Sequence, residues 1–203
     1  ASDEWGAAPA LKRLSEHVRD RRRVGMKRDR HRTMSERRSN LMVLHSSESD
    51  DWWSPTHIVE ASVKVLGGID LDPCSNLGKP NVPAKKHYTI EDDGLAHEWE
   101  GRVYLNPPYG RTIQKWTSKL INGYEGGSIT AAIALLPART DTKWFQEFAP
   151  YARCFISGRL RFVGATAPAP FPSVVFYLGD NIEAFCAEFS RYGHIYGAAL
   201  GRG

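Results

Sequence analysis

The chain has 203 residues, of which 41% are hydrophobic and 11% aromatic, and it carries a formal net charge of +4. This composition can fill one sizeable core and excludes a wholly disordered chain. No apolar run approaches the roughly 20 residues that span a bilayer, and the three cysteines lie far apart without a CxxC pair. We therefore expect a soluble, cytoplasmic protein with neither a disulfide scaffold nor a metal site.

The positive charge is concentrated near the amino terminus. Residues 1–50 contain 12 Lys/Arg and 8 Asp/Glu, whereas residues 51–203 contain 15 of each. We predict a basic arm and linker over 1–50, partly helical or disordered, followed by a folded domain over 51–203. Such an arm can neutralise nucleic-acid phosphates, or it can be a solvated tail or a helix packed elsewhere on the protein. The candidate phosphate contacts in it are Arg21, Arg22, Arg23, Lys27 and Arg28.

Predicted helices and strands alternate along the folded domain. Ser54 and Pro55 have the chemistry of a helix start, with Ser54 as N-cap and Pro55 in the first helical position. Gly67 and Gly68 end this helix. The apolar run 129–136 suits a strand buried on both faces. The other predicted elements are strands 69–72, 102–105, 153–157, 173–178 and 194–199, helices 111–122, 141–152 and 181–192, and a loop over 75–87. This alternation predicts an α/β fold with a mostly parallel sheet flanked by helices.

The four residues Asn106-Pro107-Pro108-Tyr109, here called the NPPY segment, are the most informative in the chain. They follow a predicted strand, and ligands of open α/β sheets bind beyond the carboxyl ends of strands. Two prolines fix two φ angles and remove two N–H donors, which leaves the Asn106 side chain and bare carbonyls. A flat aromatic amine could donate to Asn106 Oδ1 and to the Pro107 carbonyl while its ring stacks on Tyr109. The alternative is an ordinary proline turn that closes a strand.

Two acidic segments precede the NPPY segment. Asp70 and Asp72 lie on the predicted strand that ends at Pro73, and Asp92 and Asp93 lie in a turn between the two strands. A carboxylate beyond a strand end can accept hydrogen bonds from an ammonium group or from a ribose hydroxyl. Acidic turns are common, so it is the order of these segments relative to the NPPY segment, and not each segment alone, that supports a ligand site.

These residues resemble a known family, the phage-type DNA N6-adenine methyltransferases (the Dam family of phages and prophages), which use S-adenosylmethionine. The similarity extends from about Trp53 to about Tyr177. Besides the NPPY segment it rests on Trp53-Ser54-Pro55, Asp70-Leu71-Asp72-Pro73-Cys74, Tyr88-Thr89, Asp93-Gly94-Leu95, Trp99, Trp116, Lys119, Leu135-Leu136-Pro137-Ala138-Arg139, Thr142, Trp144-Phe145 and Gly158-Arg159-Leu160-Arg161-Phe162.

The resemblance implies a Rossmann-like methyltransferase fold and methyl transfer to the exocyclic amine of adenine in DNA. It implies that Asn106, Pro107, Pro108 and Tyr109 form the catalytic motif. The residues that it places against S-adenosylmethionine are Trp53, Ser54, Pro55, Asp70, Asp72, Pro73, Asp92 and Asp93. It also implies DNA as the partner and a bacterial or phage-infected host cell as the setting.

The sequence departs from the family pattern in two ways. The glycine-rich turn that usually follows the first strand is absent, and Cys74-Ser75-Asn76 stands in its place. The motif begins with Asn106 where many adenine enzymes have Asp. These departures leave alternatives open: methylation of cytosine N4, RNA or a protein amide, or a catalytically silent DNA-binding module with the same fold.

Further basic and aromatic residues carry weaker predictions. Arg139, which follows the apolar strand, can face substrate or pair with a surface carboxylate. Arg159 and Arg161 alternate with apolar residues, so they share one face of a strand; they are candidates for phosphate contact, or they form the solvated side of an edge strand. We expect one of Trp52 and Trp53 to pack and the other to lie at the cofactor mouth. Four aromatic residues at helical spacing are expected in the core: Trp116, Trp144, Phe145 and Phe148.

Overall fold

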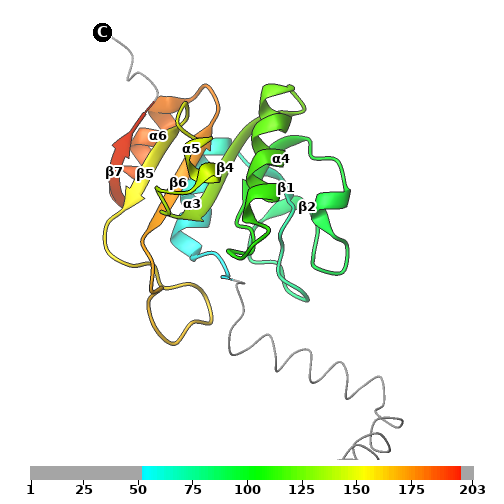
Figure 1. Ribbon diagram of the computed structural model, residues 1–203, viewed down its shortest axis with the longest axis horizontal. Coiled ribbons are helices and arrows are strands. Elements are labelled where there is room, and N and C mark those ends of the chain that lie inside the picture. Colours follow the sequence, from blue (N-terminus) through cyan, green and yellow to red (C-terminus); the bar gives the residue numbers. More distant parts are fainter. Residues whose placement is uncertain (1–51, 198–203) are drawn as a thin grey trace, which may run out of the picture. The chain divides into compact units, whose positions relative to one another are not determined.

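The computed structural model describes residues 52–197, which form an α/β fold around one seven-stranded sheet (Figure 1). The basic arm, including the five predicted phosphate contacts between Arg21 and Arg28, lies outside the described residues. The strands are β1 (Ile69–Asp72), β2 (Ala84–His87), β3 (Gly101–Leu105), β4 (Ile129–Pro137), β5 (Ala152–Ile156), β6 (Ser173–Leu178) and β7 (Gly193–Tyr196).

The sheet is mixed, with the strand order β2-β1-β3-β4-β6-β5-β7. The pairings β1–β2, β1–β3 and β3–β4 are parallel, whereas β4–β6, β5–β6 and β5–β7 are antiparallel. The predicted α/β architecture is confirmed, and the expected mostly parallel sheet is corrected to a half-parallel one. The reason is that β6 follows β5 without a crossover helix and therefore runs antiparallel to it, and β6 lies between β4 and β5 in the sheet.

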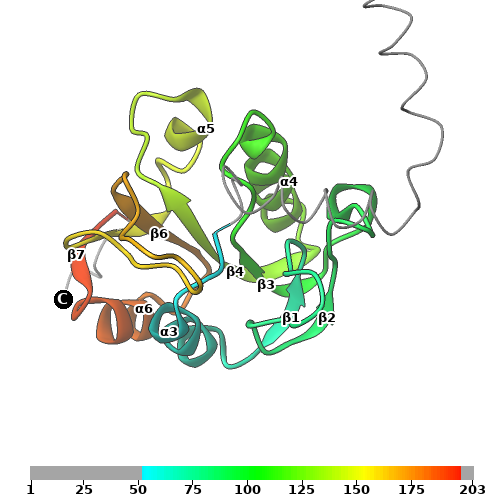
Figure 2. The ribbon, with the colours of Figure 1, turned by 90° about the horizontal axis from the view of Figure 1, so that it is seen from below.

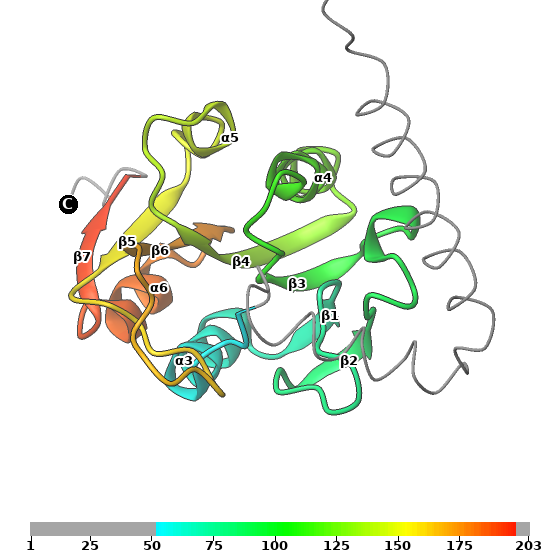
Figure 3. The ribbon, with the colours of Figure 1, turned by 60° about the horizontal axis from the view of Figure 1, so that its bottom comes forward.

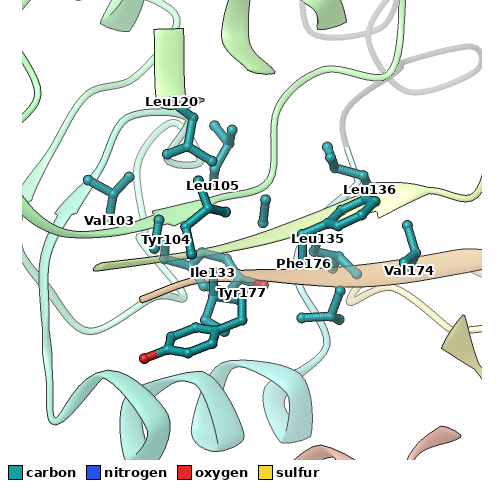
Figure 4. Close-up of a cluster of buried hydrophobic side chains, with 14 of the residues drawn as sticks. Val103, Tyr104, Leu105, Leu120, Ile133, Leu135, Leu136, Val174, Phe176 and Tyr177 are labelled. Atoms are coloured by element: carbon teal, nitrogen blue, oxygen red, sulfur yellow. The ribbon is translucent and has the colours of Figure 1, made fainter. Parts of the chain in front are cut away.

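Helices cover both faces of the sheet. Figures 2 and 3 show α4 (Ile113–Glu125) and α5 (Lys143–Gln146) on one face, and α3 (Thr56–Leu66) and α6 (Ile182–Phe189) on the other. The central strand β4 contributes the buried run that the sequence predicts, from Ala132 to Pro137. Figure 4 shows how β3, β4 and β6 fill the core, with Leu120 of α4 above the sheet and the Tyr177 ring below it. Within residues 52–197, no helix has both the length and the apolarity needed to cross a membrane.

Three predicted elements need correction. Pro55 is the N-cap of α3, and the Ser54 hydroxyl, predicted to cap the helix, bonds to Asn106 instead. The loop 75–87 contains the edge strand β2, whose exposed lysines suit an edge position. The helix predicted over 141–152 is the single turn α5, after which the chain continues in turns that pack Phe148 into the core. By contrast, Asn181 caps α6 through a bond from Ala184 N, as predicted.

The sheet brings the predicted site segments to one edge. Because β1, β3 and β4 are parallel neighbours, their carboxyl ends lie together, and Asp72, Asn106 and Ala138 stand at or just beyond those ends. The segment 157–172, which links the carboxyl end of β5 to the start of β6, leaves from the same edge and forms the long loop in the lower part of Figure 1. We call this the carboxyl edge.

Candidate functional site

The carboxamide of Asn106 is held at both ends. Its Nδ2 donates to the carbonyl of Trp52 and to Ser54 Oγ, the latter at 3.0 Å. Its Oδ1 accepts a hydrogen bond from the Tyr109 hydroxyl at 2.7 Å. Asn106 is half-buried and Pro107 is buried, so the bend is fixed by its prolines, by packing and by side-chain hydrogen bonds.

An aromatic cluster covers Tyr109. The ring of Tyr109 is only 2% exposed and packs edge-on against Phe171 at 5.5 Å and Phe162 at 6.2 Å between ring centroids. Trp52 packs on the same two phenylalanines, at 5.1 Å from Phe162 and 5.3 Å from Phe171. We call Trp52, Phe162 and Phe171 the aromatic cover. In this conformation the Tyr109 ring is buried and is not open to the base stacking that the sequence predicts.

A backbone bridge ties the aromatic cover together. Val163 N donates to the Trp53 carbonyl at 2.9 Å, which joins segment 157–172 to the residues before α3. Trp53 is 38% exposed, whereas Trp52 is half-buried in the cluster. The prediction that one of the two tryptophans packs is therefore confirmed, and Trp52 is that residue.

Asp72, at the end of β1, is a buried carboxyl in a polar cluster. It is 3% exposed and accepts a hydrogen bond from Cys74 N at 3.2 Å. Burial raises the pKa of this carboxyl to about 6, although the Cys74 amide, His87 and the Ser75 hydroxyl favour its charged form. The hydroxyls of Ser75 and Tyr104 are buried close to it and have no partner of normal hydrogen-bond geometry among the described residues. Buried hydroxyls left in this way are costly, and a bound ligand can satisfy them.

Asp70 has a different environment from Asp72. Its carboxylate pairs with Arg102 and with Lys85, each at 2.8 Å. Hydrogen bonds from Arg102 and Lys85 hold the pKa of this carboxyl well below its usual range. Arg102 also donates to the carbonyls of Leu66 and Gly67 at the end of α3. The structure therefore uses Asp70 to attach α3 to the sheet, and this ion pair occupies the carboxylate that the sequence predicts for the cofactor.

The acidic turn between β2 and β3 lies against the residue that follows β1. A Cβ on Gly94 would meet the Pro73 carbonyl oxygen at 2.1 Å, so only glycine fits this contact. Asp93 has a φ of 52° and accepts a hydrogen bond from Leu95 N. Asp92 accepts from Thr89 N and Oγ1, both at 2.8 Å, and these bonds lower the pKa of its carboxyl. The turn thus lies beside Pro73, and the carboxylates of Asp92 and Asp93, predicted to meet the cofactor, accept hydrogen bonds within the turn itself.

The basic residues predicted in the folded domain lie in exposed positions around the carboxyl edge. Arg139 follows β4 and donates to the Tyr109 carbonyl at 3.2 Å, which brings it to the NPPY segment. Arg159 and Arg161 are exposed, and Leu160 and Phe162 between and after them are buried. The predicted alternation holds, in an extended segment that belongs to no named strand.

Two surface pockets lie elsewhere. One, of about 620 Å³, is lined by Asp70, Leu71, Lys86, Tyr88, His97, Glu98, Glu100 and Gly101. The other, of about 570 Å³, lies between α3 and residues 80–83. Neither is lined by a residue of the NPPY segment. Among residues 52–197, no group of three or more His, Cys, Asp or Glu is arranged to hold a metal ion.

Several residues of the site were missed by the sequence predictions. Tyr104 on β3 precedes Asn106 by two positions, so the alternation of an extended strand places both on one face, and this signal could have identified it. Ser75 follows the predicted strand end closely and offers a similar clue. Phe171 comes from a segment rich in proline and alanine with no periodic pattern, and only the fold brings it to Tyr109.

A family model described as DNA N-6-adenine-methyltransferase (Dam) matches residues 42–171, which is 130 of the 203 residues. The matched range contains β1 to β5, the NPPY segment, Asp72 and the whole aromatic cover. No curated protein matches the chain.

Proposed function

The chain belongs to the DNA N-6-adenine-methyltransferase (Dam) family and is an adenine-specific DNA methyltransferase, and from this premise we propose that its active site is the carboxyl edge of β1 and β3. We propose S-adenosylmethionine as the methyl donor, Asp72 and its neighbours as the cofactor site, and Asn106 as the residue that binds the target amine. The carboxamide of Asn106, fixed at the end of a parallel strand, is the observation that carries this proposal.

The surroundings of Asp72 fit a ligand that carries positive charge and hydroxyl groups. Asp72 supplies a buried acceptor, and the hydroxyls of Ser75 and Tyr104 lack partners of normal geometry in the described part of the chain. The ammonium group or a ribose hydroxyl of S-adenosylmethionine can donate to such a carboxylate, and its other polar atoms can satisfy the hydroxyls. When bound, the cofactor supplies an electrophilic methyl group. Asp72 meets a cation best when ionised, which the pKa of about 6 allows at neutral pH.

Asn106 and Pro107 provide two acceptors for the two N–H groups of an adenine amine. Asn106 Oδ1 is now occupied by the Tyr109 hydroxyl, so the amine takes the place of that hydroxyl when it binds. Accepting both N–H bonds orients the nitrogen lone pair out of the ring plane, toward the donor methyl group. Opposite a bound donor, this lone pair would form the new N–C bond as the bond between the donor sulfur and its methyl group breaks. The sulfur would leave as a neutral thioether, and one N–H proton would then pass to water. No general base is needed for the attack.

Access of the base to Asn106 requires the aromatic cover to move. The amine of a paired adenine is hidden inside the duplex, so the base must be flipped out, at a cost of a few kcal/mol. Stacking on an aromatic ring returns about 1–3 kcal/mol per base. Displacement of Phe162 and Phe171 would expose the ring of Tyr109 for this stacking. Segment 157–172 also carries Arg159 and Arg161, so phosphate contacts could couple DNA binding to the opening.

Two variants test this assignment, one that should lose methyl transfer and one that should lose cofactor affinity. We expect Asn106→Ala to reduce methyl transfer to DNA by at least about 100-fold, because the acceptor for the amine is removed. Its affinity for S-adenosylmethionine, measured by titration calorimetry, should stay within a few-fold of that of the unaltered protein. Asp72→Ala should weaken cofactor affinity instead. If Asn106→Ala retains full transfer, or if Asp72→Ala binds the cofactor normally, the corresponding assignment is wrong.

A further inference from the structure

The amide group of Asn106 makes one contact that a carboxylate cannot make. Nδ2 donates to the carbonyl oxygen of Trp52 and to Ser54 Oγ. A backbone carbonyl can only accept, so the atom that faces it must carry a hydrogen. With Nδ2 held there, Oδ1 points toward the Tyr109 hydroxyl, which is the position proposed for the target amine.

We propose that Ser54 and the Trp52 carbonyl are the positioning groups that fix the orientation of the Asn106 carboxamide, so that this site needs an amide and does not accept a carboxylate in its place. This inference rests on the proposed function, because it assumes that Oδ1 receives the amine. The ionised side chain of an Asn106→Asp variant would place one carboxylate oxygen against the Trp52 carbonyl. The resulting repulsion would turn the group away or leave a buried acceptor without a donor.

Ser54 is built into this position. Its side chain is 2% exposed, and its carbonyl accepts a hydrogen bond from Asn81 Nδ2 at 2.8 Å. Asn81 in turn accepts from Asn76 at 2.8 Å, so the loop before β2 holds the backbone of Ser54 in place. Since Pro55 occupies the N-cap of α3, the hydroxyl of Ser54 is available to Asn106.

Substitution of Ser54 tests the positioning role, with Ser62 as a matched control. Ser62 is also buried and lies on α3, but its hydroxyl bonds only to the Ile58 carbonyl within the helix. We expect Ser54→Ala to lower kcat for DNA methylation about tenfold, the equivalent of one hydrogen bond. Ser54→Thr, which keeps the hydroxyl, should restore most of the rate, and Ser62→Ala should retain it. Equal rates for Ser54→Ala and Ser62→Ala would overturn the role of Ser54.

The pH dependence of Asn106→Asp gives a second test that does not depend on Ser54 variants. Once protonated, the carboxyl group of this variant can again donate to the Trp52 carbonyl, so activity should return as the pH falls. The groups around this position are Tyr109, the Tyr104 hydroxyl beside Ser54, Asp72 at the end of β1, Cys74 near Tyr109, and Arg139 after β4. They are present in both proteins, so the ratio of variant to unaltered kcat removes most of their own titration.

We expect that ratio to rise steeply as the pH falls from 8 to 6, by up to about 100-fold, because the protonated fraction of a carboxyl group grows about tenfold for each pH unit above its pKa. A ratio that does not change with pH, or an Asn106→Asp enzyme as active as the unaltered one at pH 8, would overturn the proposal. Asn106→Ala serves as the reference for the proposed function. If it remains active, Asn106 does not bind the amine at all; if it is inactive while Asn106→Asp is fully active at pH 8, only the requirement for an amide fails.

Discussion

Asp72→Asn should raise the stability of the protein at neutral pH and weaken its binding of the cofactor. The carboxyl of Asp72 is 3% exposed, and its pKa rises from 3.8 to about 6 because burial penalises the charged form. The folded state therefore keeps its proton to a higher pH than the unfolded state does. Stability from this group is complete below pH 3.8 and is lost as the pH rises through 6.

The size of the effect follows from the same pKa values. A rise from 3.8 to about 6 corresponds to at most about 3 kcal/mol of destabilisation above pH 7. The Asn carboxamide has no charge to bury, can still accept from Cys74 N, and gains an NH2 group beside the hydroxyls of Ser75 and Tyr104. For a protein of this size, about 3 kcal/mol corresponds to a rise in Tm of roughly 6–12 °C.

Thermal unfolding of both proteins between pH 4 and pH 8, without ligand, measures this difference. The Tm of Asp72→Asn should exceed that of the unaltered protein at pH 8 and approach it at pH 4. The same variant should bind S-adenosylmethionine more weakly, because the proposed partner of its positive charge is lost. A Tm difference that is independent of pH would show that Asp72 does not titrate as a buried group, and the reasoning would fail.

Three further perturbations test other parts of the fold and site. Gly94→Ala should lower the free energy of unfolding, measured by urea denaturation, by at least about 3 kcal/mol, because the new Cβ would lie 2.1 Å from the Pro73 carbonyl oxygen. A decrease below about 1 kcal/mol would refute this close approach. Arg102→Ala should lower the free energy of unfolding by about 2 kcal/mol at pH 7. This loss should become smaller below pH 3.8, because Asp70 is then protonated in the variant and in the unfolded chain. A loss that is the same at every pH would argue against the ion pair. In a plot of the logarithm of the DNA-binding constant against that of the salt concentration, the double variant Arg159→Ala/Arg161→Ala should have a slope smaller in magnitude by about two. The control Arg191→Ala, which removes an arginine paired with Glu188, should leave the slope unchanged. Equal slopes for the unaltered protein and both variants would exclude the phosphate contacts.

The main elements of the fold could be predicted because their signals are local. The apolar run of β4 and the Asn181 cap of α6 each depend on a few adjacent residues, and both were predicted correctly. The strand β2 was missed because Ala84–His87 is short, has two exposed lysines and shows no apolar alternation. The long helix predicted over 141–152 is short because Trp144, Phe145 and Phe148 pack into the core from turns as well as from a helix.

The placement of the candidate residues in the sheet was predicted better than their contacts. The sequence placed Asp72 and Asn106 at neighbouring strand ends, and parallel pairing brings those ends together. It could not distinguish Asp70 from Asp72, since the partner of Asp70 is Arg102, 32 residues away. The role of Ser54 was also hidden, because a serine before a proline suits an N-cap, and only the tertiary structure offers it Asn106 instead.

A crystal structure of the full chain with S-adenosylhomocysteine tests the central claim most directly. Our account predicts that the ligand lies at the carboxyl edge, with a polar group on Asp72 and its sulfur toward Asn106. Partners for the hydroxyls of Ser75 or Tyr104 should appear in the same complex. If the ligand instead occupies the pocket lined by Asp70, Tyr88 and His97, the proposed active site is contradicted.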